Sequence, residues 1–260
     1  MGFIMKNIIS GIIAAFSMYT KIPVPSKKMD DKGMRYALCF FPLTGAVIGF
    51  LVMLWLSVSY VLGFNQTVKA AVICVIPLLV TGGIHMDGFL DTADALSSHK
   101  SREEKLEILK DPHTGAFAII CGLIYIILYF AMWTGLSTKT ALILSVGFVL
   151  SRALSAFAAA VFLKAKKSGL LYALAGRGER RAVIASSLVY AALSTAAFFI
   201  IDWKIAVFVT AGALAAFIVY RIVAYRQFNG TTGDLAGYFL CLCELFMAIA
   251  AQLGEALWSL

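Results

Sequence analysis

Long apolar stretches constrain the fold of this sequence more than any other feature. Seven of them recur along the chain, at roughly 36–62, 68–84, 115–134, 140–163, 182–201, 203–223 and 233–252. A helix needs about 20 apolar residues to cross a bilayer. Charged residues make up only 14% of the chain, whereas a water-soluble domain carries about a quarter. We therefore predict an all-α, polytopic integral membrane bundle of about seven transmembrane helices.

The N-terminal segment differs from these stretches. Residues 3–18 are apolar but interrupted by Lys6 and Asn7, and Pro23 and Pro25 follow them. No small-x-small cleavage site stands where a signal peptidase would need one. We expect a retained interfacial or re-entrant helix here. No linker or repeat divides the sequence, so residues 1–260 are predicted to form a single transmembrane domain.

Cysteine and charge usage narrow the function. All five cysteines fall in apolar stretches without metal-finger spacing, which is typical of small buried hydrophobes. Successive connections alternate between rich and poor in Lys and Arg, with seventeen on one side and three on the other. Cytoplasmic loops retain these residues, so the basic side is predicted to face the cytoplasm and the C-terminus the outside. The net charge of +8 is thereby explained without a nucleic-acid partner.

Half of the fourteen acidic residues lie between positions 87 and 111, on the basic side. At about 100° per residue, Asp87, Asp91 and Asp94 share one helical face. Three carboxylates with no basic residue among them repel one another near a low-dielectric boundary. Oxygen-only ligands favour Mg²⁺, Mn²⁺ or Ca²⁺, and Mg²⁺ normally completes its shell with water and phosphate oxygens. The cluster predicts a Mg²⁺ site for phosphoryl or diphosphate transfer.

A solvated acidic helix end, neutralised by nearby lysines, is the alternative to a metal site. That alternative describes Glu103, Glu104 and Glu107 well, because they interleave with basic residues on an amphipathic helix. Ser101 and Glu104 have the spacing of a capping box for that helix. The alternative describes the three aspartates poorly, since no basic residue lies among them.

Two features precede the aspartates. Gly82 and Gly83 would let the backbone approach a bulky ligand, or would simply end the apolar span. His85 is a candidate general base for a hydroxyl nucleophile, because its ordinary pKa lies near neutrality. Orienting a carboxylate or binding a phosphate is its alternative role.

Three further charged residues lie in or beside apolar spans. Asp234 opens the last span at its basic end, and Glu244 lies about 15 Å deeper along the same helix. Arg152 is also placed within a span. Charges inside a membrane are functional candidates by default. Arg152 either pairs with Glu244 or contacts a substrate phosphate, and the sequence leaves both alternatives open.

These residues resemble one known family. The segments that carry the resemblance are residues 81–95, Ser101-Arg102, 106–111 with Gly115, 16–25, 40–45, Ser151-Arg152, and 232–234 with Glu244. They are similar to cobalamin synthases, the adenosylcobinamide-GDP ribazoletransferases. The resemblance runs over essentially the whole chain and is most specific in residues 81–115.

The resemblance implies a Mg²⁺-dependent enzyme of the cytoplasmic (inner) membrane with segment 81–115 facing the cytoplasm. It would join adenosylcobinamide-GDP to α-ribazole, or to α-ribazole 5′-phosphate, and release GMP. The three aspartates would hold Mg²⁺ against the diphosphate, and His85 or one aspartate would take the proton from the ribose hydroxyl. Arg102, Asp111 and Arg152 would position phosphates or the nucleobase.

Other functions fit the sequence less well. A CDP-alcohol phosphotransferase would show an Ala-Arg pair after its first aspartates, where this chain has Thr92, Ala93 and Asp94. A polyprenyl transferase would need a second aspartate-rich motif, for which Asp234 stands alone. A cation transporter would place its carboxylates near the membrane midplane and show inverted repeats. The sequence leaves a homo-oligomer open.

Overall fold

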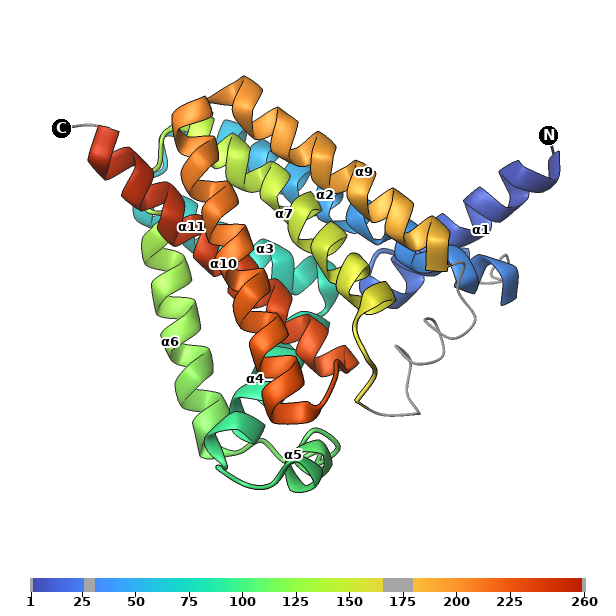
Figure 1. Ribbon diagram of the computed structural model, residues 1–260. Helices are drawn as coiled ribbons and strands as arrows, with labels where there is room; N and C mark the ends of the chain where they lie inside the picture. Colours follow the sequence, from blue (N-terminus) through green and yellow to red (C-terminus); the bar gives the residue numbers. More distant parts are fainter. Residues whose placement is uncertain (1, 26–30, 166–179, 259–260) are drawn as a thin grey trace.

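The computed structural model describes residues 2–25, 31–165 and 180–258 (Figure 1). Its helices are α1 (Gly2–Tyr19), α2 (Asp31–Val61), α3 (Gln66–Thr81), α4 (Ile84–Ser97), α5 (Arg102–Ile108), α6 (Ala116–Trp133), α7 (Thr138–Val161), α9 (Arg180–Ile201), α10 (Trp203–Phe228) and α11 (Gly233–Trp258). Six of them are long and apolar enough to cross a membrane, and α3 with α4 form a bent pair that makes up to seven. The structure thus confirms a polytopic all-α bundle.

Local sequence signals set the helix ends. Asn65 accepts a hydrogen bond from the Val68 amide and caps α3, and Ser137 caps α7 in the same way. At the end of α10, Asn229 adopts the left-handed conformation that favours helix termination. Short turns around residues 63–65, 135–137 and 229–230 separate successive helices, and each contains a glycine.

One end of the bundle gathers three interhelical turns and the C-terminus, and polar contacts tie it together. Glu255 of α11 accepts a hydrogen bond from the Ser137 amide at 3.0 Å. Gln252 donates to the carbonyl oxygens of Met132 and Thr134, both at 3.0 Å. Figure 1 shows α4 and α5 at the lower end of the bundle, away from this C-terminal end. The chain therefore alternates between two ends, as the Lys and Arg pattern predicts.

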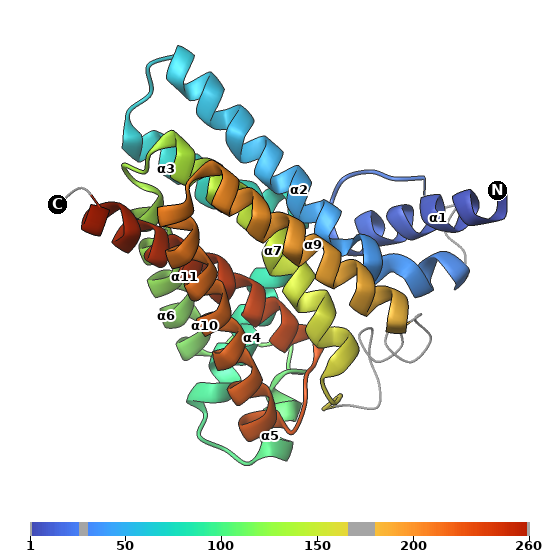
Figure 2. The same ribbon diagram turned by 45° about the horizontal axis from the view of Figure 1, so that its top comes forward.

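Helices α7 and α11 form the centre of the bundle. In the most apolar 18-residue stretch of α7, 72% of the residues are buried, whereas the corresponding figure for α9 is 17%. Helix α2 crosses α7 closely, because β-carbons built on Gly45 and Gly49 would lie 2.2 and 2.3 Å from α7 carbonyl oxygens. Small residues four apart allow this approach between membrane helices. Figure 2 shows α2 and α9 running along α7.

The span predicted at 68–84 is the one that the structure changes. Helix α3 is only 16 residues long, about 24 Å, which is shorter than a hydrocarbon core of about 30 Å. Gly82 and Gly83 then take φ values of +64° and +80°, which only glycine adopts readily. The chain turns by 97° into α4. Consequently α3 and α4 form a broken span, and α4 carries the acidic residues.

Candidate functional site

The three predicted aspartates lie on one side of α4. The helix runs unbroken from Ile84 to Ser97, so Asp87, Asp91 and Asp94 share a face as predicted. Asp87 is exposed and the other two are half-buried. Within the bundle, the opposite side of α4 packs through buried residues such as Phe89.

Helix α4 lies directly against the start of α11. A β-carbon built on Gly88 would be 2.6 Å from the carbonyl oxygen of Asp234 and 2.9 Å from its Cα. One built on Gly237 would be 2.9 Å from the carbonyl oxygen of His85. Real β-carbons do not come this close, so both positions require glycine. The crossing brings Asp234, a carboxylate from a second helix, next to the segment that carries Asp87 and Asp91.

Asp94 points toward a different element. A β-carbon built on Gly115, the residue before α6, would lie 2.1 Å from the Asp94 Oδ1 atom. The Asp94 carboxylate therefore rests against the backbone at the start of α6. Seven residues of helix, about 10.5 Å of rise, separate Asp94 from Asp87. Asp94 therefore lies two turns along α4 from Asp87, at the contact with α6.

The donor set fits a magnesium ion held largely by substrate and water. In the part of the chain that the structure describes, no three His, Cys, Asp or Glu side chains converge on one metal position. Mg²⁺ is commonly bound by only one or two carboxylates plus phosphate oxygens. Asp87 and Asp91, one helical turn apart, suit this arrangement. Asp94 is set apart at the contact with α6, and magnesium binding by Asp87, Asp91 and Asp94 stays a prediction.

His85 lies away from the acidic face. It is 8% exposed, and its ring packs 6.4 Å from the Tyr19 ring and 5.8 Å from the Phe41 ring. Its Nε2 atom is buried, and none of the described residues hydrogen-bonds to it. The structure does not bring this imidazole together with the three aspartates.

Arg152 and Glu244 form a buried ion pair between α7 and α11. Arg152 is 1% exposed and Glu244 7%. Arg152 Nη1 also donates to Ser151 Oγ at 2.9 Å and to the Phe148 carbonyl oxygen at 3.2 Å. Of the two alternatives that the sequence leaves open, the structure shows the pairing.

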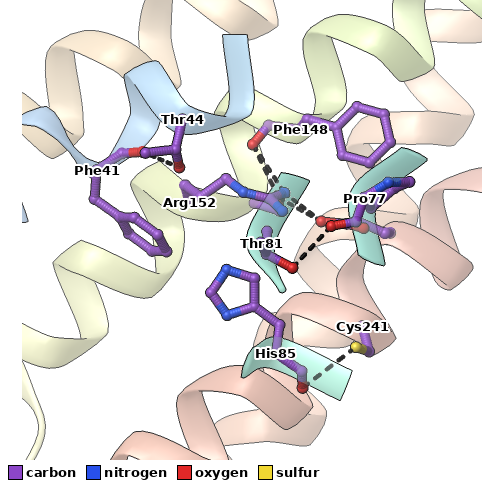
Figure 3. A network of polar contacts seen from close by, with 10 residues as sticks. Phe41, Thr44, Pro77, Thr81, His85, Phe148, Arg152 and Cys241 are labelled. Atoms are coloured by element: carbon purple, nitrogen blue, oxygen red, sulfur yellow. Dashed lines mark hydrogen bonds and ion pairs between the residues drawn. The ribbon is translucent and has the colours of Figure 1, made fainter. Parts of the chain in front are cut away.

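A small cavity separates this ion pair from His85, and Figure 3 shows Thr81 between the two. Its volume is about 20 Å³, and its walls include Thr81, His85, Arg152 and Glu244. This is enough for one water molecule. Like His85 Nε2, Arg152 Nε is buried without a hydrogen-bond partner among the described residues. The cavity next to the α3–α4 break thus has buried polar groups on walls that are otherwise largely apolar.

Arg102 and Asp111 lie in and just after the short helix α5. Arg102 Nε donates to the carbonyl oxygen of Arg226 at the end of α10, 3.1 Å away. Asp111 accepts hydrogen bonds from the His113 amide at 3.0 Å, and this contact and the His113 ring lower the pKa of the Asp111 carboxyl. Both side chains are exposed. Neither is brought into contact with the aspartates of α4.

The structure adds contacts of residues for which the sequence predicts no individual role. The Lys21 side chain packs across Gly82 at the α3–α4 break. The Asp94 carboxylate lies against Gly115, where a side chain would clash with it. The segment 16–25 stands out in the sequence by its resemblance to the family, which is the only signal for Lys21. Apart from the presence of glycine at positions 88 and 237, nothing in the sequence predicts the close contacts that these two residues make.

The fold and the site together define a multi-pass helical membrane protein with an acidic helix across one end of its bundle. The chain matches the family described as cobalamin-5-phosphate synthase over residues 11–252. It belongs to this family, which confirms the resemblance seen in residues 81–115.

Curated relatives carry one common name, adenosylcobinamide-GDP ribazoletransferase. The protein from Lachnoclostridium phytofermentans is 46% identical over 241 residues, covering 93% of this chain and 92% of the relative. One from Clostridium botulinum is 32% identical and covers 96% and 99%. A relative from Azorhizobium caulinodans is also 32% identical and covers 92% and 94%. No solved structure matches the chain.

Proposed function

We propose that this protein is a membrane transferase that joins adenosylcobinamide-GDP to α-ribazole, or to α-ribazole 5′-phosphate, with release of GMP. The product is adenosylcobalamin or its 5′-phosphate. The observation that carries the proposal is the match to relatives of this name over nearly the full length of both chains. The acidic face of α4, flanked by Asp234 of α11, supports a reaction at a diphosphate.

The products identify the bonds that change. Because GMP leaves, the ribose hydroxyl attacks the phosphorus that is bonded to cobinamide. A new phosphorus–oxygen bond forms to the ribose, and the bridging bond to GMP breaks. Negative charge develops on the departing GMP oxygen, and the hydroxyl gives up its proton.

The residues on α4 divide this work. Asp87 and Asp91 would hold Mg²⁺, which supplies charge neutralisation at the diphosphate when it is bound. An α4 aspartate accepts the proton of the attacking hydroxyl, because the His85 imidazole lies on the other side of the helix among aromatic rings. Within the bundle, Arg152 and Glu244 hold α7 and α11 together behind the site.

The reaction takes place at the cytoplasmic face of the cell membrane. The end of the bundle that carries α4 and α5 is the one rich in Lys and Arg by sequence. Cytoplasmic loops retain these residues, so this end is the one that we place in the cytoplasm. Cysteine substitutions at exposed Lys100 and Asn65, labelled with an impermeant thiol reagent in intact cells, test this orientation.

GMP release from adenosylcobinamide-GDP tests the function directly. Membranes containing the protein should release GMP only when both α-ribazole and Mg²⁺ are present. A CDP-alcohol phosphotransferase would instead release CMP from a CDP-alcohol, and a polyprenyl transferase would release pyrophosphate from a polyprenyl diphosphate. Absence of GMP release with both substrates and Mg²⁺ would overturn the proposal.

A further inference from the structure

The segment after α1 is fastened to the α3–α4 break. The Lys21 amide donates a hydrogen bond to the Val80 carbonyl oxygen near the end of α3, at 2.8 Å. Thr20 is buried, and its hydroxyl donates to the Phe16 carbonyl oxygen and accepts from the Ile22 amide. The backbone on both sides of Lys21 is therefore held in place against the end of α3.

The side chain of Lys21 is held as well. A β-carbon built on Gly82 would lie 2.3 Å from Lys21 Cε and 2.7 Å from its Cγ. The aliphatic stem thus lies across Gly82, and any larger residue at position 82 would displace it. This fixes the ammonium, one bond beyond Cε, beside the break. A stem packed on protein keeps its charged end available while it loses mobility.

The ammonium lies close to the acidic helix without being neutralised by it. Lys21 is exposed, and the ion pairs found among the described residues do not include it. Asp87 follows the break by one turn of α4, since its amide donates to the Gly83 carbonyl oxygen at 2.8 Å. One turn is about 5.4 Å. Lys21 is therefore held at the start of the helix whose first turn carries Asp87, a carboxylate that would hold Mg²⁺.

We propose that Lys21 binds a phosphate oxygen of the diphosphate substrate. This inference rests on the proposed function and assigns it a further substrate-binding residue. The diphosphate of this substrate is esterified at both ends, and its two negative charges are spread over four non-bridging oxygens. Mg²⁺ usually keeps several waters and contacts only some phosphate oxygens, and a lysine ammonium is a compact partner for one of the others. Lys21 thereby holds the substrate over the α3–α4 break, with its other phosphate oxygens directed toward the aspartates of α4.

Steady-state GMP release by the full-length protein in nonionic detergent tests this contact. Adenosylcobinamide-GDP is varied at saturating α-ribazole, and then the reverse. Lys21→Gln should lower kcat/KM for adenosylcobinamide-GDP roughly 10- to 100-fold, as expected for loss of a charged hydrogen bond. The KM for α-ribazole, which has no phosphate, should stay within about twofold. Lys21→Arg should recover part of the loss.

Lys139→Gln is the matched control, because Lys139 is exposed at the opposite end of the bundle and the change in charge is the same. A Lys21→Gln enzyme with an unchanged kcat/KM for adenosylcobinamide-GDP overturns the inference. The inference is also overturned if Lys21→Gln raises the KM for α-ribazole as much as the KM for adenosylcobinamide-GDP. If the unmodified protein releases no GMP at all, the proposed function has failed instead.

Two further measurements separate the alternatives. A phospholipid headgroup offers the same phosphate chemistry, so the comparison is repeated in vesicles with and without anionic lipid. A defect that appears only with anionic lipid assigns Lys21 to the membrane and overturns the substrate role. In the unsubstituted protein, adenosylcobinamide-GDP should protect Lys21 but not Lys139 from acetylation, read by mass spectrometry. Equal acetylation of Lys21 with and without substrate also overturns the inference.

Discussion

Gly88 of α4 lies against the backbone of Asp234 in α11, so closely that a β-carbon at position 88 would be 2.6 Å from the Asp234 carbonyl oxygen. Gly237 makes the reciprocal contact one turn further along α11. The two helices therefore meet backbone to backbone. This contact is what adds a carboxylate from α11 to the acidic region of α4.

Gly88→Val should separate the two helices and reduce activity strongly. Overpacking of this kind destabilises a protein by about 1–3 kcal/mol. A displacement of about 1 Å at a catalytic group can reduce the rate by roughly 100-fold. We expect GMP release per folded protein to fall by about that factor. Gly233→Ala is the control, because a β-carbon there meets nothing within 4 Å. Near-normal turnover by Gly88→Val would show that the crossing does not position the site.

Asp87→Asn should abolish most activity while leaving the fold intact. Asp87 is exposed, so the amide fits without burying a new polar group, but the charge that would hold Mg²⁺ is lost. We expect kcat/KM to fall roughly 100-fold or more. Chelation by EDTA should abolish GMP release by the unsubstituted protein, and added Mg²⁺ should restore it. Glu103→Gln removes the same charge from exposed α5 and should have little effect. Near-normal GMP release by Asp87→Asn would contradict the assignment.

Hydropathy alone predicts most of this fold, because each span has to be long and apolar whatever it packs against. The exception is the stretch at 68–84. Counting apolar residues carries the span through Gly82 and Gly83, whereas the backbone turns there by 97°. Two consecutive glycines permit either outcome, and tertiary packing decides between them. The stretch is therefore part of a bent pair of helices instead of one straight span.

The candidate site is predictable only in part. Helical spacing places Asp87, Asp91 and Asp94 on one face of α4. The same spacing places His85 roughly opposite to Asp94, so the separation of His85 from the acidic face is predictable from the sequence. Depth along the helices puts Arg152 and Glu244 at similar levels but does not identify them as partners. The contact of Lys21 with Gly82 joins residues sixty positions apart, and nothing local to either residue encodes it.

The capping box of α5 should respond to acid. Ser101 donates hydrogen bonds to the Glu104 carboxylate through its hydroxyl at 2.8 Å and its amide at 3.0 Å, and these bonds lower the pKa of Glu104 from 4.5. Because the folded-state pKa is lowered, this stabilisation is present above pH 4.5 and is lost as the pH falls through the lower folded value. Amide hydrogen exchange in residues 101–109 should therefore accelerate below pH 4.5 beyond its intrinsic pH dependence. Glu104→Gln should remove this extra acceleration, and its persistence in that variant would contradict the prediction.

Replacing both Arg152 and Glu244 should lower the free energy of unfolding by less than the sum of the two single replacements. Removing one partner leaves a buried charge without compensation, which destabilises by about 3–5 kcal/mol. We therefore expect Arg152→Met and Glu244→Gln each to weaken resistance to unfolding in mixed micelles by about this amount. The double variant should lose clearly less than the sum of the two. Ser151→Ala is the matched control, because the Ser151 hydroxyl donates to Glu244 at 3.3 Å and accepts from Arg152 at 2.9 Å without carrying a charge itself. Its loss should cost about 1.5–3 kcal/mol, less than the loss of either charge. Strictly additive losses in the double variant would show that the two charges are not energetically coupled.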